Sequence, residues 1–560
     1  MTAELTDPTL GRSEPDRFWT LANASEACPL VMSPLCWTLW LRAFEMGTRG
    51  SLYDFGILPR SEVHLPDDPN EFAASCFHGR LAMNVDKLRI VLGAVPGSSA
   101  DDFERDLIGR ARPDAPTVPN SLRRLPFIAV RMPWSMLRQG PRLRRLHNEQ
   151  LTWWQANVLD PAGTPDPRAL LREADRRFEA SFRLHLYARG NLLMAMQSQL
   201  TKLATSVGGA DLVGRVIGGV GGVSETDLAT QMWELSRGRG TRDEFIRRHG
   251  FHGPSGGSPI ARSWRENPGQ IDRLVAAYAD RPDEFEPRAR ERTAMAARKV
   301  AARELLDGLA RHQRPLGRLL LAGIAAQVRH LELGKASFVM AIDGARSAVR
   351  RIGDDLVAAG LANDRDDAFY LTYDELVGPL PGDFAELVAY RRSCRARHSV
   401  TSLPMTWTGM PKPTADRDTD HRTHPDRGAD PDAHTARAAA IGVEPSVIGA
   451  EPSAGVVVTG AAAGGGVVEG IARVVLDPDE DPFEAGEVLV CRFTDPGWAP
   501  LFGLAAAVVI DVGGAASHGA VVARELGIPC VIGTGNGTRV LRSGQRIRVD
   551  GRSGVVTGLG

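Results

Sequence analysis

One histidine, His518, lies in the stretch DVGGAASHGAVVARELGIPCVIG, where an apolar run, a glycine pair and a helical pattern follow one another. The pattern predicts a buried strand, a tight turn at Gly514, and a helix that Ser517 caps and Gly527 ends. The free N–H groups and positive dipole end of a helix N-terminus favour an anion. A neutral imidazole is nucleophilic near neutral pH, so these residues predict a phosphoryl group carried on His518. A capping or core histidine is the alternative.

Residues around His518 could contact such a phosphoryl group. We expect Ser517, Gly519 and Gly514 to bind phosphate through the turn and the start of the helix. Thr494 follows the apolar run EVLVCRF and precedes the turn Asp-Pro-Gly-Trp, so its side chain could face the histidine. Ordinary turn chemistry and helix capping explain the same residues without a phosphate.

The elements that must position these residues divide the chain by hydrophobic period. We predict a multidomain fold: an N-terminal extension over 1–27, a large, mainly α-helical domain over 28–408, a Pro-, Asp- and His-rich flexible linker over 409–453, and a small C-terminal α/β domain over 454–560. Pro315 interrupts a long helical stretch, which we therefore expect to form at least two helices.

Composition excludes several classes of function. The formal net charge of -1 gives no overall field for nucleic acid. No apolar run has the length of a membrane span, and the polar N-terminus has no signal-peptide core, so we expect a cytoplasmic protein without a membrane partner. The six cysteines form no CxxC pair, and we expect no metal site.

The segment GGAASHGAVVARELGIPCVIGT closely resembles the phosphohistidine signature of the phosphoenolpyruvate-utilising enzymes. This resemblance implies that His518 is phosphorylated and that its domain swivels between two sites. Upstream, PLVMSPLCWTLW, HGRLAMNVDKLRIVLGAVPG and DDAFYLTYDEL are similar, in order, to the substrate domain of rifampin phosphotransferases. The resemblance therefore extends to the helical domain.

One turn departs from the pattern of these relatives, which carry acidic residues where this chain reads HGPSGGS. Without those carboxylates, His249 and His252 become candidate catalytic bases, although an ordinary polar turn explains them slightly better. Four charged residues, by contrast, follow the relatives and could form a phosphate clamp: Arg329, Glu332, Lys335 and Arg346. A surface pair between Glu332 and Lys335 is the alternative.

The source of the phosphoryl group is a separate question, because the sequence contains no GxxxxGK loop. The resemblance implies ATP with Mg²⁺, and we expect both to be bound by a separate ATP-grasp partner, like the nucleotide-binding part of pyruvate phosphate dikinase, with no cofactor bound by this chain alone. The expected function is a phosphotransferase acting on a hydroxyl of a small organic molecule. A phosphorylation-driven dehydratase or condensing enzyme and a non-enzymatic phosphocarrier are the alternatives.

Overall fold

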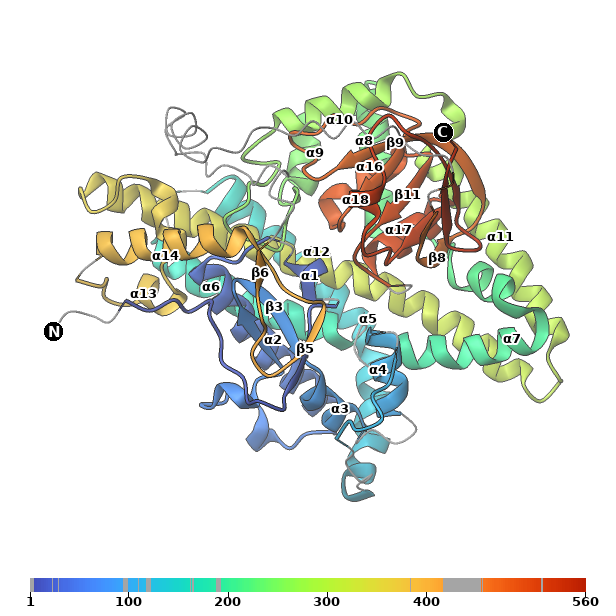
Figure 1. The fold of residues 1–560 in the computed structure, drawn as a ribbon, viewed down its shortest axis with the longest axis horizontal. Coiled ribbons are helices and arrows are strands. Elements are labelled where there is room, and N and C mark those ends of the chain that lie inside the picture. The colour runs from blue at the N-terminus through green and yellow to red at the C-terminus, as the bar shows by residue number, and fades with distance from the viewer. Residues whose placement is uncertain are drawn as a thin grey trace.

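The computed structural model has a helical region and a C-terminal region rich in β-strands, as the hydrophobic periods predict (Figure 1). Most of the predicted linker, residues 416–453, lies outside the residues that the structure describes. Those described are 5–22, 24–28, 30–93, 99–108, 110–116, 122–161, 163, 166–187, 193–382, 384–415, 455, 457–514 and 517–559. None of the helices formed by them is long and apolar enough to cross a membrane.

The longest helix, α12 (Arg314–Ala358), is the central support of the helical region. It packs along α6 (Pro167–Tyr187) and α5 (Leu125–Trp154), and most residues in its second half are buried. Pro315 lies in its first turn, where a missing N–H costs nothing. The predicted break at this proline is confirmed, because a separate helix, α11 (Pro287–Gly308), precedes it.

A small antiparallel sheet lies beside α2 (Pro34–Asp54). Its strand order is β2 (Ala74–Phe77), β3 (Arg80–Asn84), β1 (Phe18–Thr20) and β5 (Thr406–Thr408). β1 comes from the predicted N-terminal extension and pairs with both β3 and β5. The extension and the last strand before the predicted linker therefore meet in one sheet.

The remaining elements of this region are α1 (Ala24–Ala27), α3 (Val85–Gly93), α4 (Ala100–Ile108), α7 (Met194–Ile217), α8 (Ser224–Ser236), α9 (Arg242–His249), α10 (Gly269–Ala279), α13 (Tyr373–Val377), α14 (Phe384–Ser399), β4 (Thr401–Ser402) and β6 (Thr414–Ala415).

The C-terminal region is built on an eight-stranded sheet. Its strands, in spatial order, are β7 (Val457–Thr459), β14 (Val555–Gly558), β13 (Arg546–Asp550), β9 (Val467–Val475), β10 (Val488–Cys491), β11 (Ala507–Ile510), β12 (Cys530–Ile532) and β8 (Ala461–Gly464). The pairs from β9 to β12 are parallel and the others are antiparallel. Three helices accompany the sheet: α16 (Ala499–Leu504), α17 (His518–Glu525) and α18 (Gly537–Val540).

The C-terminal domain shares an apolar core with helices α8 to α10, which lie against it in Figure 1. Trp233, Trp264 and Tyr278 of the helical region belong to the same buried cluster as Trp498 and Phe502. The Tyr278 hydroxyl also donates to the carbonyl of Pro500 at 2.6 Å. Burial of aromatic side chains is a large stabilising contribution, so this is a docked arrangement of the two domains.

Candidate functional site

His518 is the first residue of α17, as the sequence predicts. Ser517 caps the helix: its backbone is extended and its hydroxyl accepts a bond from the N–H of Ala520 at 3.4 Å. A side chain at Gly519 would collide with the Thr494 hydroxyl, 2.7 Å from where its Cβ would lie. Ser517, Gly519 and Thr494 thus surround the start of the helix. Among the described residues, nothing lies within 4 Å of a Cβ at Gly514.

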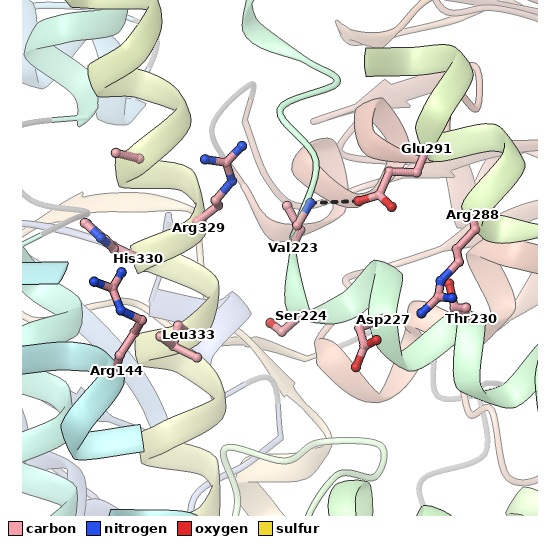
Figure 2. A pocket seen from close by; sticks show the side chains of 12 residues that line it. Arg144, Val223, Ser224, Asp227, Thr230, Arg288, Glu291, Arg329, His330 and Leu333 are labelled. Atoms are coloured by element: carbon pink, nitrogen blue, oxygen red, sulfur yellow. Dashed lines mark hydrogen bonds between the residues drawn. The ribbon is translucent and has the colours of Figure 1, made fainter. Parts of the chain in front are cut away.

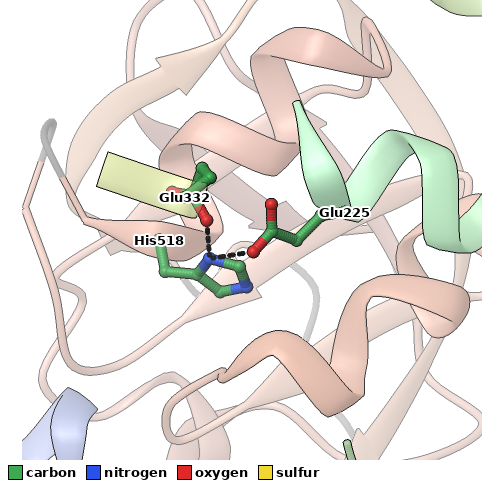
Figure 3. Close-up of side chains that lie close together, drawn as sticks. All are labelled: Glu225, Glu332 and His518. Atoms are coloured by element: carbon green, nitrogen blue, oxygen red, sulfur yellow. Dashed lines mark ion pairs between the residues drawn. The ribbon is translucent and has the colours of Figure 1, made fainter. Parts of the chain in front are cut away.

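Two carboxylates face the imidazole of His518 (Figure 3). Nδ1 lies 3.5 Å from Oε2 of Glu332 on α12 and 3.9 Å from Oε1 of Glu225 on α8. All three side chains are buried. The two carboxylates therefore lie on the Nδ1 side of the ring, and Nε2 is the nitrogen turned away from them.

Burial and the charge of Glu332 together raise the pKa of Glu225 from 4.5 to about 8. Taking a carboxylate out of water disfavours its charged form, and a second carboxylate nearby adds to that effect. His518 and Lys335 act in the opposite direction on the same pKa. Lys335 lies one helical turn beyond Glu332, so its positive charge faces the same cluster.

Glu225 is a functional candidate that the sequence did not reveal. It follows Ser224 in the first turn of α8, where an acidic residue is commonplace because it complements the helix dipole. The available signal was its position two residues after the Gly-rich segment VIGGVGGV, because glycines allow another part of the chain to approach the backbone closely. Glu332, in contrast, was predicted.

His252 lies near the charges of His518 and Lys335, and His249 lies next to His252. Burial lowers the pKa of His252 to about 3, and the charges of Lys335 and His518 add to this effect. His249 lies with its ring centre 6.0 Å from that of His252, and burial lowers its pKa well below the ordinary value. Nδ1 of His252 and Nε2 of His249 are buried and have no hydrogen-bond partner among the described residues. Both rings are therefore neutral, and their catalytic role stays a prediction.

Arg329 and Arg346 have other contacts. The guanidinium of Arg329 donates to the carbonyls of Gly221 and Val220 at 2.7 and 2.6 Å. Arg346 is buried, pairs with Asp343 at 2.6 Å and donates to backbone carbonyls of the turn after His252. Among the four predicted clamp residues, Glu332 faces His518 and Lys335 acts through its charge on Glu225 and His252, whereas the two arginines support loops. A phosphate clamp that includes those arginines stays a prediction.

The cluster also has the donor spacing of a cation site. One ligand atom each from Glu225, Glu332 and His518 lie within 4.8 Å of one another. Imidazole and carboxylate ligands suit several divalent metals. The expectation that this chain binds no metal therefore stays untested.

Two models of known protein families match parts of this chain. A model described as "PEP-utilising enzyme, mobile domain" matches residues 483–554, which include the Asp-Pro-Gly-Trp turn and His518. A model of the rifampicin phosphotransferase fourth domain matches residues 239–331. The second match contains His249, His252 and Arg329 and ends one residue before Glu332, whereas Glu225 lies outside both matches.

Three relatives illustrate the similarity. A rifampicin phosphotransferase of Streptomyces sp is 32% identical over 311 residues, which are 51% of this chain and 32% of that protein. Another, from Streptomyces sviceus, is 30% identical over 424 residues, 73% of this chain and 43% of that protein. A probable phosphoenolpyruvate synthase of Staphylothermus marinus is 50% identical over 104 residues, 18% of this chain and 12% of that protein.

The matched part of this chain spans less than half the length of each of these relatives. Within that part, the resemblance expected from the sequence is confirmed: the chain carries the mobile domain of phosphoenolpyruvate-utilising enzymes and is a relative of the rifampicin phosphotransferases.

Proposed function

We propose that this protein is a phosphotransferase component that passes a phosphoryl group through His518 to a hydroxyl of a small organic molecule. The observation that carries the proposal is the orientation of His518. Its Nδ1 lies 3.5 Å from the Glu332 carboxylate, at the N-terminus of α17. The negative charge of this carboxylate favours the tautomer with the proton on Nδ1, in which Nε2 has the free electron pair.

Nε2 is then the nitrogen that carries the phosphoryl group. In the transfer step the acceptor oxygen attacks phosphorus in line, the P–O bond forms and the P–Nε2 bond breaks, with its electron pair returning to the ring. The hydroxyl proton is released to water, because Glu332 lies on the Nδ1 side of the ring, away from the Nε2–P bond. The positive charge of Lys335 offsets the negative charge of the transferring group.

We further propose that the phosphoryl group comes from ATP, bound with Mg²⁺ by a separate ATP-grasp protein. The support is the mobile-domain match over residues 483–554. The mobile domain would receive the group at the partner and deliver it in the docked arrangement.

Incubation with labelled ATP and a purified ATP-grasp partner tests this scheme. We expect an acid-labile label on this chain that His518→Ala abolishes and that the matched variant His312→Ala, at an exposed position, retains. Labelling of the His518→Ala variant at the wild-type level would exclude the central claim.

Mass analysis of acceptor molecules then decides the class of reaction. A gain of one phosphoryl group supports the phosphotransferase. Loss of water without retained phosphate would indicate the dehydratase, and an unchanged set of small molecules would indicate a phosphocarrier.

A further inference from the structure

A cavity of about 590 Å³ lies between α12 and α8, beside the His518 site (Figure 2). Ser224 and Leu333 line it, and each is the direct neighbour of one of the two glutamates at His518. Six charged or titratable side chains also line it: Arg144, Asp227, Arg288, Glu291, Arg329 and His330. In Figure 2, Arg144, Arg329 and His330 lie on one side, opposite Asp227, Arg288 and Glu291.

Two cations of this cavity are available, whereas each of its carboxylates accepts a hydrogen bond. Arg144 and Arg288 have no hydrogen bond or ion pair with another described residue, unlike the neighbouring Arg145, which pairs with Glu149 at 2.7 Å. By contrast, Glu291 accepts the N–H of Gly222 at 2.8 Å, and Asp227 accepts the side-chain amide of Gln231 at 2.5 Å. The unmet bonding capacity is therefore that of guanidinium groups, which suit carboxylates and phosphates.

Part of the remaining lining is apolar. Val223, Ala326 and Leu333 contribute hydrocarbon surface, and the volume lies in the range of cavities that bind small organic ligands. We propose that this cavity binds an organic anion, with its carboxylate or phosphate group between Arg144 and Arg329 and its apolar body against these three side chains.

An occupied cavity would stabilise the docked mobile domain. Arg329 holds the carbonyls of Val220 and Gly221, whose N–H groups bond to the Glu525 carboxylate of α17 at 3.0 and 2.8 Å. Ser224 donates to Glu225 at 2.9 Å. Because these bonds use Nε and Nη2 of Arg329, the ligand can bind Nη1 without breaking them. Binding then restrains the loop on which α17 rests.

Calorimetric titration of the whole chain tests the proposal with three probes: phenyl phosphate, benzoate and neutral phenol. We expect saturable binding of at least one of the two anions and none of phenol. Arg144→Gln should weaken that binding about tenfold or more, which corresponds to about 1.4 kcal/mol. Arg145→Gln is the matched control, because this exposed neighbour on the same helix does not line the cavity.

Arg288→Gln removes the second available guanidinium, on the opposite side of the cavity, and should weaken binding less than Arg144→Gln. Failure of both anions to bind at millimolar concentration would overturn the proposal. Binding that is equal in Arg144→Gln, Arg288→Gln and Arg145→Gln would do the same.

Two sources of the anion are consistent with the site, and turnover distinguishes them. A substrate or product of the transfer competes with the acceptor, whereas an effector changes the rate without competing. Either pattern, lost in Arg144→Gln and kept in Arg145→Gln, supports the cavity as the binding site. The titration needs no turnover, so it remains decisive even if His518 is never phosphorylated and the proposed function fails.

Discussion

The carboxylate of Asp495 accepts a hydrogen bond from the backbone N–H of Ser255 at 2.5 Å, and it thereby joins the mobile domain to the helical domain. Its other oxygen accepts the N–H of Gly497 at 2.8 Å. Ser255 has a positive φ of 59°, so this turn is held in a backbone conformation that is uncommon for serine. This turn, HGPSGGS, lacks the acidic residues that the relatives carry. The carboxylate that contacts it is that of Asp495, which belongs to the mobile domain.

Asp495→Ala should therefore destabilise the docked protein by about 1–3 kcal/mol, because it leaves buried N–H groups without an acceptor. Asp495→Asn keeps one acceptor oxygen and should cost less. Unfolding by denaturant measures both. Equal losses for the two variants would mean that the hydrogen bonds contribute little and that packing dominates.

A close backbone approach between the domains gives a second prediction. A Cβ at Gly497 would lie 2.3 Å from the carbonyl oxygen of Gly253, and its other nearest atoms also belong to the helical domain. Gly497→Ala should thus weaken docking by about 1–3 kcal/mol, since neither backbone can move aside without strain. Hydrogen exchange in α17 should increase.

Gly465→Ala is the control for this change, since nothing lies within 4 Å of a Cβ there. The partner should still phosphorylate His518 in both variants, whereas transfer to the acceptor should fall only in Gly497→Ala. Unchanged exchange and transfer in Gly497→Ala would contradict the docked arrangement.

The sequence predicted the local parts of this site and missed the parts that depend on packing. The cap at Ser517 and the helix start at His518 follow from residues next to one another, so their types and order were sufficient. Glu225 reaches His518 only because α8 and α12 approach it from different parts of the chain. Arg346 stands where the relatives have it, but it is buried and pairs with Asp343. The spacing of residues in the sequence cannot tell this ion pair from a phosphate clamp.

The raised pKa of Glu225 predicts a pH dependence. Between the unfolded value near 4.5 and the folded value of about 8, the folded protein holds a proton that the unfolded chain has lost. Stability from this group is therefore complete below pH 4.5 and is lost as the pH rises to about 8. Thermal unfolding across this window should show a decline that Glu225→Gln removes.

Asp227→Asn, an exposed position on the same helix, should keep that decline. Glu332→Gln should move it to lower pH, because removal of the neighbouring negative charge lowers the pKa of Glu225. A decline of the same size and position in Glu225→Gln would assign it to another group.

Lys335 and Arg346 should separate catalysis from stability. Lys335→Met removes a positive charge that acts on Glu225 and His252, and we expect phosphoryl transfer to fall on the order of 100-fold with little change in unfolding.

Arg346→Met leaves Asp343 without one of its buried partners, and it should cost about 3–5 kcal/mol of stability. Transfer per folded molecule should then stay close to the wild-type rate. Single-turnover transfer from phosphorylated His518, normalised to the folded fraction, measures both variants. A loss of transfer in folded Arg346→Met would place this arginine on the phosphoryl group after all, and an unimpaired Lys335→Met would remove the lysine from the mechanism.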